Sequence, residues 1–136
     1  MKSLILISAA VILIFLEGCE TSKIITQKNY DLSTEKTAAV GSTMLSYISA
    51  KSQTFQSNSS DSGTKDELVY TGKSGSTIRI DFIEYYIYEG DWYLEDGYPL
   101  HLEYDMASGN IITCKYYKMM ILSSDNNEIK FIVISD

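Results

Sequence analysis

Residues 76–88 read STIRIDFIEYYIY, and this stretch decides the fold class. In its first half, apolar side chains at Ile78, Ile80 and Phe82 alternate with polar ones. Successive side chains of a β-strand point to opposite faces, so this period of two is typical of a strand with one buried face. In residues 83–88 both faces become apolar or aromatic. We therefore predict one long strand whose second half either crosses between two packed surfaces or bends.

Runs with the same period surround this strand: residues 67–71, 98–106, 111–122 and 128–135. Turn-forming residues separate these runs, and the segments 72–75 and 107–110 have the composition of hairpin turns. Several short strands with turns between them, and no long helical pattern, indicate an antiparallel all-β domain. We predict a small antiparallel sandwich or a partly closed barrel of about six to eight strands.

The sequence before these runs is less regular. In residues 37–50, Val40, Met44 and Ile48 recur at helical spacing, but Gly41 interrupts the run. The alternation from Met44 onward fits a strand about as well as a helix. We favour a turn at Gly41 followed by a strand, with a helix as the alternative.

Two further segments are mostly polar. Residues 51–65 read KSQTFQSNSSDSGTK, in which Phe55 is the one apolar side chain. Such a segment cannot bury enough apolar surface to offset the entropy lost on ordering, so we predict a mobile, Ser-rich loop. Residues 19–36 are predicted to form a tether, either as a plain linker or with one edge strand at residues 23–28.

The composition excludes several classes of protein. The chain has 136 residues, which is enough for one domain and a targeting segment. Its 18 acidic and 11 basic residues give a net charge of -7. Phosphate binding needs Lys and Arg gathered on one face, so this balance argues against nucleic acid as a partner. One His and two Cys also exclude a multi-histidine metal site and a four-cysteine zinc site.

The remaining short motifs predict no chemistry. Gly72, Lys73 and Ser74 resemble the end of a phosphate-binding loop, but a strand follows where that loop needs a helix. His101 falls on the polar face of a strand and is predicted to be a surface side chain. Cys114 is predicted to be a small buried side chain. We therefore assign no catalytic or metal-ligating residue, and we expect neither a cofactor nor enzyme activity.

The acidic loop of residues 89–97 (EGDWYLEDG) is the most distinctive surface segment. Its carboxylates do not have the spacing of a Ca²⁺-binding EF-hand loop, so a solvated connection is favoured over a metal site. Exposed aromatic side chains often anchor a partner, and Trp92 and Tyr93 lie at the tip of this loop. We predict Trp92 and Tyr93 as partner contacts. The alternative is that Trp92 folds back over the end of the sheet as a plug.

The N-terminus has the composition of a secretion signal. Lys2 precedes residues 3–16 (SLILISAAVILIFL), which carry no charge and are fewer than the roughly 20 residues that a helix needs to cross a bilayer. The next residues resemble the lipobox of bacterial lipoproteins, with Glu17 in place of a small or β-branched residue: Leu16, Glu17, Gly18 and Cys19. This resemblance implies cleavage before Cys19, a thioether-linked diacylglycerol on its sulfur and often an N-acyl chain such as palmitate.

These features divide the chain into a signal peptide (residues 1–18), a lipid-attached tether (residues 19–36) and a small β domain (residues 37–136). The resemblance implies a place in the bacterial cell envelope, outside the cytoplasm, with the inner or the outer membrane bound through Cys19. We expect a non-catalytic binding or structural module with a possible protein partner in the envelope. The alternative is an inhibitor or exclusion factor that acts on an incoming enzyme or phage.

Overall fold

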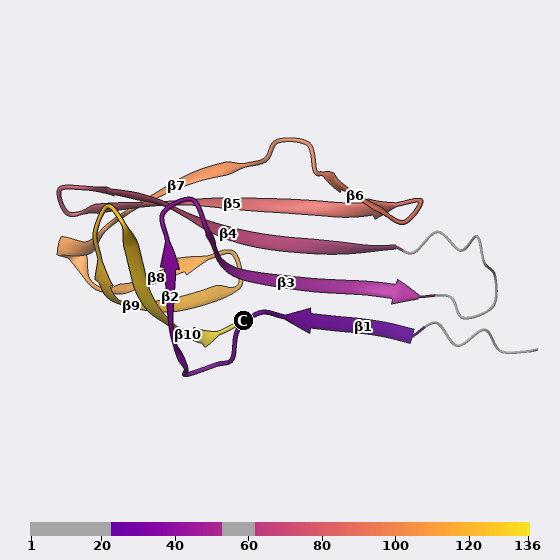
Figure 1. The fold of residues 1–136 in the computed structure, drawn as a ribbon, viewed down its shortest axis with the longest axis horizontal. Coiled ribbons are helices and arrows are strands. Elements are labelled where there is room, and N and C mark those ends of the chain that lie inside the picture. The colour runs from indigo at the N-terminus through magenta and orange to yellow at the C-terminus, as the bar shows by residue number, and fades with distance from the viewer. Residues whose placement is uncertain (1–22, 53–61) are drawn as a thin grey trace, which may run out of the picture.

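The chain forms two antiparallel β-sheets that pack face to face and are not closed into a barrel (Figure 1). The computed structural model describes residues 23–52 and 62–136. It contains ten strands: β1 (Lys23–Lys28), β2 (Glu35–Ala39), β3 (Thr43–Ser52), β4 (Ser62–Ser74), β5 (Thr77–Tyr88), β6 (Asp91–Leu94), β7 (Leu100–Asp105), β8 (Ile111–Cys114), β9 (Tyr117–Ser124) and β10 (Glu128–Ser135). The structure thus confirms the predicted all-β, antiparallel, sandwich-like fold.

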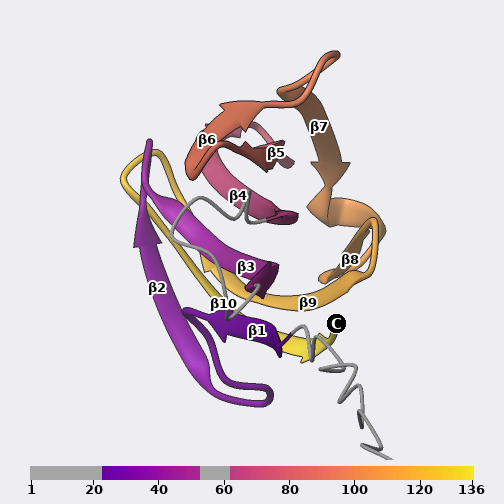
Figure 2. The same ribbon diagram turned by 90° about the vertical axis from the view of Figure 1, so that its right-hand side faces the viewer.

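The larger sheet has six strands and is organised around β5. Its order is β1-β3-β4-β5-β6, and β7 also pairs with β5. The first half of β5 borders β7, from Thr77 to Phe82, and the second half borders β6, from Tyr85 to Tyr88. The smaller sheet has the order β2-β10-β9-β8. Figure 2 shows the two sheets end-on, with the six-stranded sheet curving over the four-stranded one.

The core lies between the two sheets. Ile78, Ile80 and Phe82 of β5 are almost fully buried, as their alternation in the sequence predicts. The four-stranded sheet contributes its own alternating residues: Ile112, Met119, Ile121, Ile129, Phe131 and Val133. Burial of these apolar side chains is the main stabilising contribution to a domain of this kind.

The six-stranded sheet extends beyond the four-stranded sheet. Strands β3, β4 and β5 have 10, 13 and 12 residues, whereas β8, β9 and β10 have 4, 8 and 8. The second half of β5 lies in the extension, at the right in Figure 1. Among the described residues no second sheet covers it, and Tyr86 and Tyr88 are exposed. Of the two alternatives that the sequence left for residues 83–88, the crossing between two packed surfaces is therefore wrong.

The structure has more strands than the six to eight that the sequence predicted. Residues 111–122 form two strands, because the chain turns at Lys115 and Tyr116, where Lys115 has a φ of 54°. The apolar alternation continues through this turn and conceals it. Strand β6 arises inside the predicted acidic loop, and β2 precedes the predicted turn at Gly41.

The segment 107–110 is not a hairpin turn. A 3₁₀ helix (Met106–Ser108), capped by the Asp105 carboxylate, leads the chain from β7 in one sheet to β8 in the other. Turn-forming residues predict a change of direction, but they do not specify which sheet the next strand joins. The predicted turn at 72–75 is also displaced, because β4 continues to Ser74 and the turn falls at Gly75 and Ser76.

The less regular N-terminal segments are also extended. A turn near Gly41 precedes β3, so the strand that we favoured for residues 37–50 is correct and the helix is not. Of the predicted Ser-rich loop, residues 51–52 and 62–65 belong to β3 and β4, which pair there from Lys51 opposite Ser62. Residues 23–28 of the predicted tether form the edge strand β1.

The residues that carry the predicted signal peptide and lipidation site lie outside the described part of the chain. Within residues 23–52 and 62–136, no helix has the length and apolar character that a membrane span requires.

Candidate functional site

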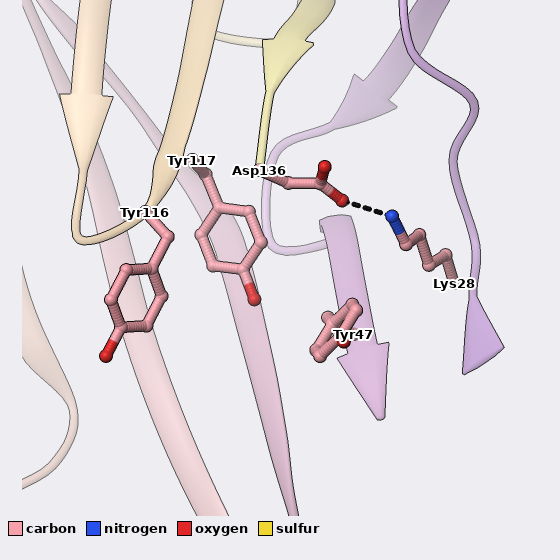
Figure 3. Close-up of a pocket in the computed structure, with 5 residues that line it drawn as sticks. All are labelled: Lys28, Tyr47, Tyr116, Tyr117 and Asp136. Carbon is pink, nitrogen blue, oxygen red and sulfur yellow. Dashed lines mark hydrogen bonds and ion pairs between the residues drawn. The ribbon is translucent and has the colours of Figure 1, made fainter. Parts of the chain in front are cut away.

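A pocket of about 380 Å³ opens at the place where the four-stranded sheet ends and the six-stranded sheet continues (Figure 3). Five residues from distant parts of the chain line it: Lys28, Tyr47, Tyr116, Tyr117 and Asp136. They come from β1, β3, the β8–β9 turn, the start of β9 and the C-terminus. The lining of the pocket thus comes from both sheets.

A row of polar residues forms the boundary between the core and this pocket. Lys28 of β1 is paired with Tyr47 of β3, which is paired with Asp66 of β4, which is paired with Glu84 of β5. The preceding row on the same face contains Leu45, Leu68 and Phe82 and is buried. The core therefore ends in a row of side chains that can form hydrogen bonds. This row lies two residues along each strand from the last buried apolar row.

Asp66 is the buried centre of this boundary, with 7% of its surface exposed. Its carboxylate accepts a hydrogen bond of 2.8 Å from the Tyr117 hydroxyl, and the Lys115 ammonium lies 3.9 Å away. Lys115 also forms an ion pair with Glu84. Burial raises the pKa of Asp66, although the bond from Tyr117 and the charge of Lys115 act in the opposite direction. Burial also raises the pKa of Tyr117, so its hydroxyl stays protonated and donates.

The pKa of Asp66 leads to a prediction on stability. Because its folded pKa lies above the ordinary value of 3.8, the native state binds more protons than the unfolded state from about pH 3.8 up to that raised pKa. The contribution of Asp66 to stability is therefore greatest below pH 3.8 and falls as the pH rises. Asp66→Asn keeps an acceptor for Tyr117 and should remove this pH dependence in urea unfolding.

Asp136→Asn is the matched control, because Lys28 and Tyr30 lower the pKa of the Asp136 carboxyl. Its contribution to stability is present above pH 3.8 and is lost as the pH falls, so the two variants should change the pH profile in opposite directions. If the free energy of unfolding of wild type and of Asp66→Asn changed with pH in parallel, the claim that burial raises the pKa of Asp66 would be contradicted.

On the opposite wall of the pocket, the carboxylate of Asp136 binds two side chains. The Tyr30 hydroxyl donates to the Asp136 carboxylate at 2.6 Å, and Lys28 forms an ion pair with the same carboxylate. The Lys28 ammonium lies 5.6 Å from the centroid of the Tyr47 ring, within the range of a cation–π interaction. The two charged side chains that line the pocket are thus paired with each other, and the rest of its lining consists of phenol rings.

Tyr116 is the most accessible of the lining side chains. It is 67% exposed and contacts the ring of Tyr117 edge-on, with the centroids 6.5 Å apart. The lining therefore consists of three phenol rings and one ion pair. Tyrosine offers a large apolar face and a hydroxyl, which suits ligand binding.

Trp92 and Tyr93, predicted as partner contacts, lie away from this pocket on the edge strand β6. They point to opposite faces of the sheet. Trp92 is half-buried beside Lys65, whose ammonium lies 5.8 Å from its ring, and it is not part of the buried core between the sheets. Tyr93 is exposed and stacks on Tyr86, with the ring centroids 5.8 Å apart.

The other residues singled out in the sequence have clear environments. His101 lies on the surface, and its Nδ1 is 2.7 Å from the Asp81 carboxylate, a partner that the sequence did not reveal. Cys114 is buried, as predicted, and burial raises the pKa of its thiol to about 11. In the described ranges, no three His, Cys, Asp or Glu side chains are placed to hold a metal ion.

The residues of the pocket were not found from the sequence, although the chain has eleven tyrosines. The number of tyrosines indicated that some of them could form a binding surface, but it does not specify which rings lie together in the fold. The chain matches no family model, and no curated protein and no solved structure is significantly similar to it. The proposals below therefore depend on the chain's own residues.

Proposed function

We propose that this protein is a lipid-anchored protein of the bacterial cell envelope, and that its β-sandwich is a non-catalytic binding module. The observation that carries the proposal is the tyrosine-lined pocket at the open end of the sandwich (Figure 3). The resemblance of residues 16–19 to a lipobox supports the anchor. Cleavage before Cys19 and attachment of two or more acyl chains would hold the domain stably at a membrane.

The size and lining of the pocket support its assignment as a ligand site. Its volume of about 380 Å³ falls in the range of small-molecule sites, which combine aromatic walls with a few polar groups. Two of its lining side chains are held in place before any ligand arrives, because Tyr117 is bound to Asp66 and Asp136 is bound to Tyr30 and Lys28. Such preorganisation reduces the entropy lost on binding.

The charges of the pocket indicate which ligands fit. The side chains of Lys28 and Asp136 neutralise each other, so the lining side chains offer no unpaired charge to an ionic ligand. The rings of Tyr47, Tyr116 and Tyr117 offer apolar faces and hydroxyl groups. We therefore propose an uncharged ligand that has both an apolar face and hydroxyl or amide groups, such as a sugar ring or a polar segment of a partner protein.

Site-specific photo-crosslinking in intact cells tests this proposal. p-Benzoylphenylalanine in place of Tyr116 keeps an aromatic ring at the mouth of the pocket. The matched control carries the same residue at Leu122, which is exposed on β9 but does not line the pocket. Irradiation should give an adduct of higher mass from position 116 and none from position 122. The absence of adducts, or the same adducts from both positions, would contradict the assignment of the pocket.

A further inference from the structure

Five aromatic side chains gather at the end of the six-stranded sheet that extends beyond the core, on β5 and β6: Tyr85, Tyr86, Tyr88, Trp92 and Tyr93, called the aromatic end below. The exposed fractions of Tyr86, Tyr88 and Tyr93 are 40%, 57% and 43%. The ring of Tyr93 contacts both other rings, with centroid distances of 5.8 Å to Tyr86 and 6.3 Å to Tyr88. These rings support one another and face solvent.

The aromatic end and the start of β1 lie at the same end of the molecule. Ile24 of β1 is paired with Lys51 of β3, which is paired with Ser62 at the start of β4. At the other edge, Tyr88 is paired with Asp91 across the β5–β6 turn. Figure 1 shows the start of β1 and the β5–β6 turn at the right-hand end of the molecule, on opposite edges of the six-stranded sheet. Ile24 and Ile25, which are 61% and 46% exposed, add apolar surface there.

The length of chain before β1 limits where a lipid on Cys19 can lie. Four residue steps separate Cys19 from Lys23, the first residue of β1. At the maximum extension of a polypeptide this corresponds to about 14 Å. A lipid on Cys19 would therefore hold the start of β1, and with it the aromatic end, close to the membrane surface.

The chemistry of this end suits a lipid–water interface. Trp and Tyr are enriched at membrane interfaces, where an apolar ring and a polar group are satisfied together. The charges at this end are balanced, although the chain as a whole carries a net charge of -7. The Lys65 ammonium, 4.2 Å from the centroid of the Tyr85 ring and 5.8 Å from that of the Trp92 ring, is paired with Glu67. At the tip of the sheet, Lys23 and Lys51 offset Glu89 and Asp91. The end is therefore not repelled from a membrane as strongly as the overall charge would suggest.

We infer that the aromatic end rests on the membrane to which the chain is tethered, with Trp92 and Tyr93 at the lipid–water interface. This inference rests on the lipid anchor of the proposed function. In this orientation the strands of the six-stranded sheet run away from the membrane. Lys28 follows Lys23 by five residues, so the pocket lies about 17 Å farther along β1 from the membrane than the start of that strand, open to the envelope.

The fluorescence of Trp92, the one tryptophan of the chain, tests this orientation directly. A chain that begins at Cys19 contains all ten described strands. Its Cys19 thiol can be coupled to a maleimide lipid in phosphatidylcholine vesicles, because Cys114 is buried and unreactive. Nitroxide-labelled lipids near the headgroup should quench Trp92 about twofold, since an interfacial ring lies within their reach.

The matched control moves the single tryptophan to the last residue of β4, which lies beside the end of β5 that is far from Tyr88. Ser74 is exposed and pairs with Thr77, which lies about 36 Å along the strand from Tyr88. In the variant Trp92→Phe, Ser74→Trp the nitroxide lipids should leave the emission unchanged. Equal quenching at both positions, or none at either, would overturn the proposed orientation. Because the coupling is chemical, this result does not depend on lipidation in the cell, which the Cys19→Ala experiment below tests separately.

Discussion

Replacing Phe131 with alanine is expected to lower the free energy of unfolding by about 3–5 kcal/mol, which is a large part of the stability of a small domain. Phe131 is fully buried on β10, between β2 and β9. Its neighbours on the same face, Ile129 and Val133, are also fully buried, so they cannot move into the space without losing their own contacts. The measurement is urea unfolding followed by far-UV circular dichroism.

Tyr116→Ala is the control for this prediction. Tyr116 is 67% exposed, so its truncation should change the free energy of unfolding by no more than about 0.5 kcal/mol. A Phe131→Ala protein as stable as wild type would mean that the two sheets do not share the core described above. A Tyr116→Ala protein as unstable as Phe131→Ala would mean that the pocket is part of that core.

Replacing Cys19 with alanine is expected to abolish lipidation of the protein completely, because the thioether that carries the diacylglycerol cannot form. The variant should remain an uncleaved precursor of higher mass and should not be labelled by a fatty-acid probe. The intact mass of the protein and labelling of cells with an alkyne analogue of palmitate measure both effects. Cys114→Ala is the matched control, because its thiol is buried in β8 and should play no part in the labelling. Labelling that survives Cys19→Ala would contradict the anchor.

The parts of the fold that could be predicted are those in which one face of a strand is buried. In β5, the alternation of Ile78, Ile80 and Phe82 correctly indicated the strand and the side that forms the core. The turn at Lys115 and Tyr116 could not be predicted, because the apolar pattern continues through it and neither residue is a usual turn former. The crossing from β7 to β8 depends on how two sheets pack, which local turn composition does not record.

The candidate site was harder to predict than the fold. Trp92 and Tyr93 were selected as aromatic residues in an acidic loop, and the structure places them on a paired edge strand instead. The pocket depends on pairing between segments that are far apart in the sequence: Lys28 and Asp136 are 108 positions apart, and Asp66 and Tyr117 are 51 apart. Each of these side chains is ordinary by itself, and only the strand register brings them together.

The attachment of this domain to a membrane through Cys19 is tested most directly by the intact mass of the protein extracted from membranes in detergent. We expect residues 19–136 with a diacylglyceryl group on Cys19, with or without an additional acyl chain. A membrane-derived protein that retains residues 1–18, or that begins at another position with an unmodified Cys19, would contradict the lipid anchor.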